Sequence, residues 1–323
     1  DGVSEMLGEL KRETFDKHGA FTVGEVFNIT DDDLSDFIGE NGYFSTIFDF
    51  STELLSAGEH GWYDAPDVAF PAWKKAIFHA QDQAYGCGFE SNIIENHDEP
   101  RGVSHYIPEG DCCDTSKKML AALNFMLRGL PFIYQGQEIG MENLTFTSID
   151  QVDDISSIDE YHVALDAGCT EKEALACVSR YSRDNARTPV QWDTTENAGF
   201  SKGTPWLPVN PNYKDINVEA QVNDPDSLFS FYKALIALRK DPEYKETIVY
   251  GKLIPYLEEQ HNLMSYYRKG DKTLLVLGNF QKEPQSAVLP SAYKKVLLNN
   301  YPEVSVSGNT VTLDNYQVLI LEL

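Results

Sequence analysis

The chain has 323 residues, of which 42% are hydrophobic and 12% aromatic, and its net charge is −25 at pH 7. This composition supports a sizeable core and excludes an intrinsically disordered chain. The acidic balance excludes nucleic acid and anionic membrane surfaces as partners, because both bind basic faces.

The cysteines and the apolar runs indicate the cellular context. The cysteine count is odd and two cysteines are adjacent, which disfavours the disulfide framework of a secreted protein. We therefore predict reduced thiols in a cytoplasmic protein. No Cys-x-x-Cys pair occurs, and no apolar run reaches about 18 residues, so the sequence predicts no metal, no cofactor and no membrane span. The cysteines are Cys87, Cys112, Cys113, Cys169 and Cys177.

Short apolar runs alternate with helical patterns over the first 134 residues. Such alternation is typical of βα units that build a parallel sheet. About four units predict half of a (β/α)₈ barrel, here its second half. The predicted strands are 20–26, 44–50, 89–95 and 130–134, and the predicted helices are 4–18, 71–85 and one that begins at Asp114.

The alternation of predicted strands and helices is interrupted at 142–225, an acidic stretch with short helical pieces and a long loop that contains Pro, Asn and Gly. A loop this long inside an enzyme is usually a functional insertion. A helix at 226–240 follows. We predict a barrel domain at 1–241 and an antiparallel C-terminal β-sandwich domain at 242–323. The strands predicted in the second domain are 263–268, 273–280, 294–298 and 316–322.

Two carboxylates follow predicted strands at their C-terminal ends, where parallel α/β folds keep their chemistry. Glu25 ends the strand at 20–26, and Asp98 follows the strand at 89–95 together with His97. The two carboxylates are 73 residues apart, a spacing that fits neighbouring or next-but-one strands of one barrel.

Four motifs occur in this order: Thr22-Val23-Gly24-Glu25, Glu95-Asn96-His97-Asp98-Glu99-Pro100-Arg101, Tyr134-Gln135-Gly136-Gln137-Glu138-Ile139-Gly140-Met141 and Ser182-Arg183-Asp184-Asn185-Ala186-Arg187-Thr188-Pro189-Val190-Gln191-Trp192-Asp193. Together they resemble the family 13 glycoside hydrolases, the α-amylase superfamily. The nearest branch resembles oligo-1,6-glucosidase and dextran glucosidase, and the likeness extends over nearly the whole chain. The resemblance implies a retaining α-glucosidase that hydrolyses short isomalto- or malto-oligosaccharides from the non-reducing end.

The resemblance also implies residue roles. Glu25 matches the general acid/base, and Asp98 matches the carboxylate that stabilises the oxocarbenium-like transition state. His97, Arg101 and Arg187 match substrate-binding positions. These residue types suit the chemistry, because a glycosidic oxygen needs a proton to leave and positive charge develops at the anomeric carbon.

A retaining enzyme needs a second carboxylate as nucleophile. In the family this residue ends the strand before that of the acid/base, but only 24 residues precede Glu25 here. Neither Asp1 nor Asp16 has a matching context. We therefore expect the chain to be the C-terminal part of a longer enzyme and inactive alone. Its partner would be the missing N-terminal half of the barrel or a second copy.

Two other functions remain open at this stage. One is a non-catalytic barrel that serves as a scaffold or binding subunit. The other is a relative that converts sucrose or trehalose. The choice between α-1,4 and α-1,6 linkages and the preferred chain length are not determined by the sequence.

Overall fold

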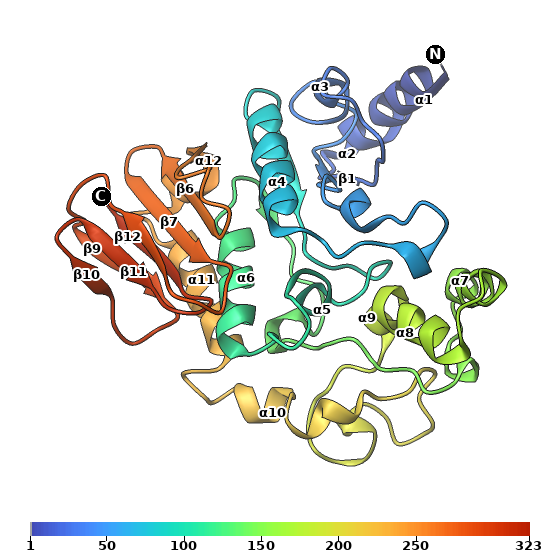
Figure 1. Cartoon of the computed structure of the whole chain (residues 1–323). Coiled ribbons are helices and arrows are strands. Elements are labelled where there is room, and N and C mark those ends of the chain that lie inside the picture. Colours follow the sequence, from blue (N-terminus) through green and yellow to red (C-terminus); the bar gives the residue numbers. More distant parts are fainter. Residues whose placement is uncertain (1) are drawn as a thin grey trace.

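The computed structural model describes residues 2–323. Figure 1 shows helix α6 (Asp114–Phe125) between the N-terminal and middle segments, coloured blue to yellow, and the orange and red strands of the C-terminal part. The helix packs against strands of that C-terminal part and against helix α11 (Leu228–Lys240). α6 is therefore central to the buried core.

A parallel sheet with the strand order β1-β2-β3-β4 carries the N-terminal half. Its strands are β1 (Val23–Gly24), β2 (Thr46–Phe48), β3 (Phe89–Asn92) and β4 (Leu130–Pro131). The predicted parallel βα arrangement is confirmed, although each strand is shorter than predicted. The backbone of Asn28 turns into the left-handed region (φ 56°) soon after β1, and Pro131 has no N–H to extend β4.

Helices precede and follow these strands. The predicted helix at 4–18 runs from Gly2 to His18, with a π-helical stretch at Lys11–Phe15, and ends at left-handed Gly19. Its predicted apolar side is not buried, since Met6 is 66% exposed. The other helices of this half are α3 (Leu34–Phe37), α4 (Phe70–Ala84) and α5 (Gly102–Tyr106).

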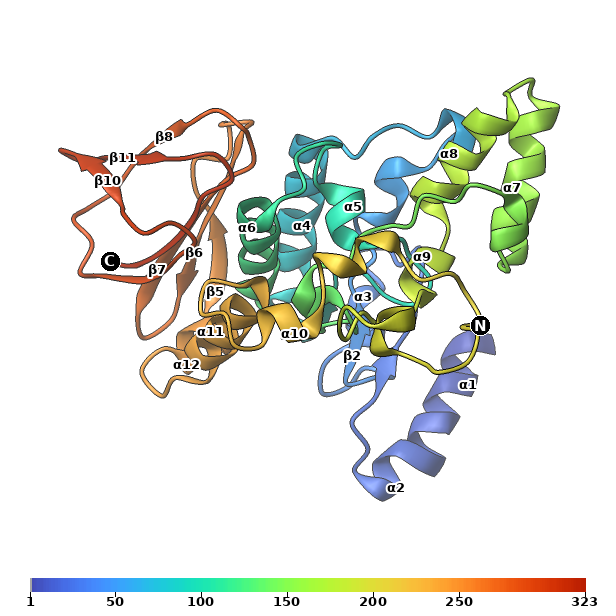
Figure 2. The ribbon, with the colours of Figure 1, turned by 90° about the horizontal axis from the view of Figure 1, so that it is seen from below.

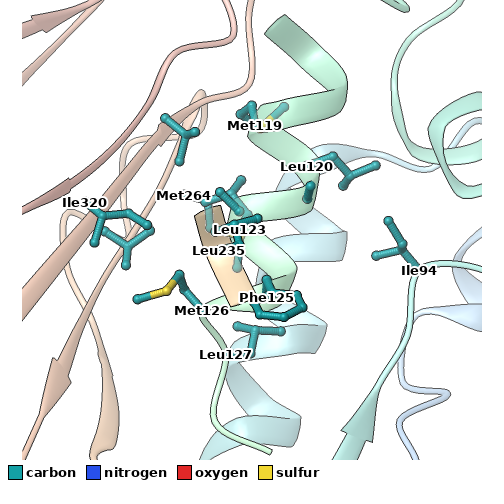
Figure 3. Close-up of a cluster of buried hydrophobic side chains, with 14 of the residues drawn as sticks. Ile94, Met119, Leu120, Leu123, Phe125, Met126, Leu127, Leu235, Met264 and Ile320 are labelled. Atoms are coloured by element: carbon teal, nitrogen blue, oxygen red, sulfur yellow. The ribbon is translucent and has the colours of Figure 1, made fainter. Parts of the chain in front are cut away.

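The main core lies on the two sides of α6. Met119, Leu123 and Met126 are fully buried and belong to one cluster with Met264 and Ile320 of the C-terminal strands (Figure 3). The helix begins at Asp114 as predicted, and its N-cap is Cys113, which forms a reciprocal capping pair with Ser116.

The stretch predicted as an insertion contains short helices. Figure 2 shows α7 (Ile155–Asp166) and α8 (Glu171–Tyr181) beside each other, far from the C-terminal strands. α9 (Asp184–Arg187) and α10 (Val218–Gln221) follow. Short 3-10 turns lie at Glu53–Ser56, Trp62–Asp64, Gln137–Ile139, Ile149–Gln151, Glu196–Gly199 and Pro211–Lys214.

The C-terminal part is antiparallel. One sheet has the order β5-β6-β7-β12-β9 and the other β10-β11-β8, and leucines of both sheets share a buried cluster. The small all-β part is therefore confirmed, although β5, β8, β10 and β11 were not predicted. The strands are β5 (Lys252–Pro255), β6 (Leu263–Lys269), β7 (Thr273–Asn279), β8 (Gln285–Val288), β9 (Lys295–Asn299), β10 (Ser305–Ser307), β11 (Thr310–Leu313) and β12 (Val318–Glu322).

The predicted domain boundary at 241/242 falls between α11 and α12 (Lys245–Tyr250), and the division into 1–241 and 242–323 stays a prediction. In the part of the chain that the structure describes, no helix has the length and apolar character needed to cross a membrane.

Candidate active site

The candidate site lies at the edge where the parallel strands end. Glu25 directly follows β1, and the segment 95–99 follows β3, the next strand but one in the sheet. Because the strands run parallel, their C-terminal ends meet at one edge. Gly24 is required at this edge, since a Cβ there would lie 2.5 Å from the ring of Phe44.

Asp98 is the most heavily contacted carboxylate of this edge. Its Oδ1 lies 2.6 Å from Nη2 of Arg187 and 3.3 Å from Nη1 of Arg183, and its Oδ2 lies 3.2 Å from Nε2 of His97. The side chain of Asn96 accepts the backbone N–H of Asp98 at 2.7 Å and fixes the turn. Burial alone would raise the pKa of Asp98, but His97 and the two arginines outweigh burial and lower it. Asp98 therefore stays ionised at neutral pH.

The two arginines are themselves held by acidic groups of the insertion. Arg183 Nε lies 2.9 Å from Oδ1 of Asp154, and its Nη2 donates to Ser156 Oγ at 2.8 Å. Arg187 donates from Nε to the backbone oxygen of His97 at 2.9 Å, and its Nη1 lies 3.7 Å from Oδ1 of the buried Asp184. The structure thus brings Asp98, His97 and Arg187 together as the sequence predicted. It adds Arg183 and Asp154, which the sequence analysis missed.

Glu25 is solvent-exposed, and two further glutamates, Glu53 and Glu99, interact electrostatically with the carboxylates of this edge. Burial raises the pKa of Glu53 and the charge of Glu25 adds to the rise, so the two carboxylates interact. Burial, Glu53 and Asp98 together raise the pKa of Glu99 to about 7. The rings of Phe27 and Phe50 stack at 4.4 Å between centroids in the same strand-end segments.

A small cavity of about 20 Å³ lies behind these carboxylates, with Asp49, Glu53, Glu99, His105 and Tyr106 among its lining residues. Burial and the charge of Arg180 lower the pKa of His105 to about 4, so the imidazole is neutral. Within residues 2–323, its Nδ1 has no hydrogen-bond partner. Glu99 thus shares this cavity with the neutral imidazole of His105 and with two further acidic side chains, Asp49 and Glu53.

Arg101 lies below the site rather than in it. Its side chain is fully buried and forms an ion pair with Glu95 at 3.0 Å. Its other donors reach the backbone oxygens of Gln135, Asn185 and Ala186 at 2.8 to 3.3 Å. All of these contacts are within the protein. The geometry therefore shows a brace that ties the strand-end segments together, and it gives no donor toward a ligand.

The segment 135–138 braces the same edge. Gln137 is buried, accepts the backbone N–H of Tyr134 at 2.9 Å and donates to the hydroxyl of Tyr232 at 2.9 Å. Glu138 accepts the N–H of Gly136 at 2.9 Å. These contacts within the protein give both side chains a structural role.

Asp1 and Asp16 are the two aspartates that precede Glu25 in the sequence. Asp16 lies exposed on helix α2 (Asp16–His18), before β1. Asp1 lies outside the described residues. Glu53 and Glu99, rather than Asp16, are the carboxylates that the structure places beside Glu25 and Asp98.

Comparison with known families and proteins gives consistent matches. The α-amylase catalytic-domain model matches residues 2–251, and the model of the α-amylase SusG C-terminal domain matches residues 263–320. An oligo-1,6-glucosidase from Parageobacillus thermoglucosidasius is 38% identical over 306 residues, which are 93% of this chain and 54% of that protein. A glucan 1,6-alpha-glucosidase from Streptococcus pneumoniae is 36% identical, over 91% of this chain and 55% of that protein.

Solved structures with the same fold cover nearly the whole chain. Trehalose-6-phosphate hydrolase from Bacillus licheniformis superimposes with a TM-score of 0.91 at 37% identity, over 99% of this chain and 59% of that one. Trehalulose synthase from Pseudomonas mesoacidophila MX-45 superimposes with a TM-score of 0.90 at 32% identity, over 99% and 58%. The chain therefore spans little more than half the length of these relatives.

Proposed function

The chain belongs to the α-amylase family of glycoside hydrolases, and from this premise we propose that the intact protein is a retaining α-glucosidase acting on short α-glucosides. The observation that carries the proposal is Asp98, held ionised by His97, Arg183 and Arg187 at the sheet edge that also bears Glu25. The relatives named oligo-1,6-glucosidase and glucan 1,6-alpha-glucosidase support isomalto-oligosaccharides as the substrate class.

The proposed division of labour follows from the charges. Glu25 donates a proton to the glycosidic oxygen, which makes the aglycone a better leaving group. The fixed negative charge of Asp98 stabilises the positive charge that develops at the anomeric carbon. Because that positive charge exists only near the transition state, Asp98 stabilises the transition state more than the bound substrate. His97 and Arg187 orient the non-reducing-end glucose. For Arg101 we propose a bracing role in place of substrate binding, because its donors are used within the protein.

Retention further requires a nucleophile on the opposite face of the sugar. We propose that it comes from the part of the fold that the longer relatives have and this chain does not cover. The same part, or a second copy, would pair with β1 and β4, which are the outer strands of the sheet formed by residues 2–323. A hollow of about 550 Å³ beside β4, lined by residues 129–133, Arg239 and Val249, supports such a contact.

The five cysteines are free thiols, which supports the proposed cytoplasmic location. The structural similarity to trehalose-6-phosphate hydrolase and trehalulose synthase keeps a disaccharide-converting activity as the second candidate. Product analysis separates the two. The α-glucosidase releases glucose from isomaltose, whereas a sucrose-converting enzyme forms an isomeric disaccharide from sucrose.

The Glu25→Gln variant of the intact protein tests the proposal. Because proton donation is lost while shape is kept, kcat/KM on isomaltose should fall by about 10²- to 10⁴-fold, with little change in binding. Glu13→Gln is the matched control, since Glu13 is an exposed glutamate that pairs with Lys17, four residues further along the same helical stretch. Near-wild-type hydrolysis by the Glu25 variant, with the control equally active, would refute the assignment of Glu25.

A further inference from the structure

The loop 192–206 of the insertion presents a large aromatic ring to solvent. Trp206 is 66% exposed, the highest value among its aromatic neighbours on the loop, Trp192 and Phe200. Its indole N–H donates to Oδ2 of Asp153 at 2.9 Å, so the ring is fixed in orientation. A large exposed aromatic ring with an anchored polar edge is typical of a recognition surface.

Asp153 connects Trp206 to the candidate active site. Its backbone N–H donates to Oδ2 of the buried Asp184 at 2.8 Å. The next residue, Asp154, holds Arg183, which in turn contacts Asp98. Trp206 therefore belongs to the same ion and hydrogen-bond network as the catalytic edge, but lies at its outer end.

The loop that carries Trp206 is held by its own polar contacts. Asn197 donates from Nδ2 to the backbone oxygens of Ser201 and Gly203 at 3.0 Å. On the other side of the tryptophan, Leu207 is buried, and Asn210 donates to the backbone oxygen of Asn143 at 3.0 Å. The position of the ring is thus set before any ligand binds, which reduces the ordering that binding requires.

We propose that Trp206 is a stacking platform for a glucosyl unit on the leaving-group side of the substrate. This inference rests on the proposed α-glucosidase function, in which His97, Asp98 and Arg187 hold the glucose at the non-reducing end. Any ring beyond that glucose belongs to the leaving group. A pyranose offers an apolar C–H face to the indole, and its hydroxyl groups can donate to the neighbouring exposed carboxylate of Asp153.

The platform makes a specificity prediction that concerns substrate length. A disaccharide places only one sugar ring beyond the cleaved bond, whereas a tri- or tetrasaccharide has further rings that the proposed platform at Trp206 would bind. The enzyme should therefore favour longer isomalto-oligosaccharides over isomaltose. A neutral, hydroxyl-rich ligand also suits a chain with a net charge of −25.

The test compares kcat/KM for isomaltose and isomaltotetraose in the intact protein. Trp206→Ala should lower kcat/KM on the tetrasaccharide by about ten-fold and leave isomaltose unchanged, while Trp206→Phe keeps most of the preference. Phe200→Ala is the control, because Phe200 is an exposed aromatic on the same loop whose ring has no N–H group to donate to Asp153. Equal losses on both substrates, or no loss on the tetrasaccharide, would overturn the platform.

A binding measurement separates this inference from the proposed function. If the intact protein hydrolyses no glucoside, the proposed function fails, and the platform is then tested by tryptophan fluorescence during titration with isomaltotetraose. The platform predicts a saturable change in the wild-type protein that is lost in Trp206→Phe and kept in Phe200→Ala. No change in the wild-type protein, or the same change in Trp206→Phe, contradicts it.

Discussion

The carboxyl of Glu99 gives a prediction that depends on pH in a defined direction. Burial raises its pKa to about 7, helped by the negative charges of Glu53 and Asp98 and opposed by Arg183. From the cavity side it faces Asp49, Tyr106 and the neutral His105. Because the ordinary pKa of a glutamate is 4.5, the folded protein holds this proton over a pH range in which the unfolded chain has released it.

The sign of the effect follows from proton linkage. Below about pH 4 both states are protonated, and Glu99 has no effect on the pH dependence of stability. Between pH 4.5 and 7 the unfolded chain releases the proton while the folded protein keeps it, so the free energy of unfolding falls as pH rises. Above about pH 7 Glu99 is ionised in both states, and the full destabilisation of the fold by the buried carboxylate is present. The difference between 4.5 and about 7 corresponds to at most about 3 kcal/mol, and partial solvent exposure of Glu99 reduces it to about 1 to 3 kcal/mol.

Glu99→Gln removes this titration while it preserves the shape of the protonated side chain. The variant should therefore be more stable than wild type by about 1 to 3 kcal/mol at pH 8 and equally stable at pH 4. Thermal unfolding of the intact protein, followed by circular dichroism at both pH values, measures the difference. Glu59→Gln, at an exposed glutamate, is the control and should have no effect. A Glu99→Gln protein that is no more stable than wild type at pH 8 would refute the argument.

Two further substitutions test the other contacts of the site. Arg101→Met leaves the fully buried Glu95 without its cation, so the free energy of unfolding should fall by about 3 to 5 kcal/mol, measured as a lower denaturant midpoint. Adding Glu95→Gln removes the unpaired charge and should recover part of the loss. An unchanged midpoint in Arg101→Met would contradict the bracing role. Asp98→Asn should lower kcat/KM more than His97→Asn, because Asp98 opposes the developing charge directly; steady-state kinetics giving the reverse order would contradict the proposed roles.

The parallel half of the fold could be predicted from the sequence because the candidate catalytic residues directly follow short apolar runs, as they do at the C-terminal ends of parallel strands. Short apolar runs followed by Glu25 and Asp98 placed both carboxylates at one sheet edge, and the structure has the strand order that this requires. The helix at 4–18 was predicted with an apolar side, yet Met6 is exposed, because periodicity shows only which residues could be buried together.

The contacts around Asp98 were predicted only in part. Arg187 was identified by its motif, whereas Arg183 reaches Asp98 through its contact with Asp154, the N-cap of α7, and that approach depends on how the insertion folds. The role of Arg101 depended on burial, which a motif does not report. In the same way, the high pKa of Glu99 arises from its burial and from the charge of Glu53, which a separate segment contributes, and both are properties of the tertiary structure.

The central claim is that the intact protein cleaves α-glucosides with retention through Glu25 and the network around Asp98. Proton NMR of a fresh reaction with isomaltitol measures the anomer of the released glucose before mutarotation. In this substrate the leaving group is a sugar alcohol without an anomeric carbon, so all of the glucose comes from the non-reducing side. The account predicts α-glucose first, with β-glucose appearing only later, and no glucose from Glu25→Gln on the same time scale. Initial release of β-glucose, or undiminished release by the Glu25 variant, would contradict it.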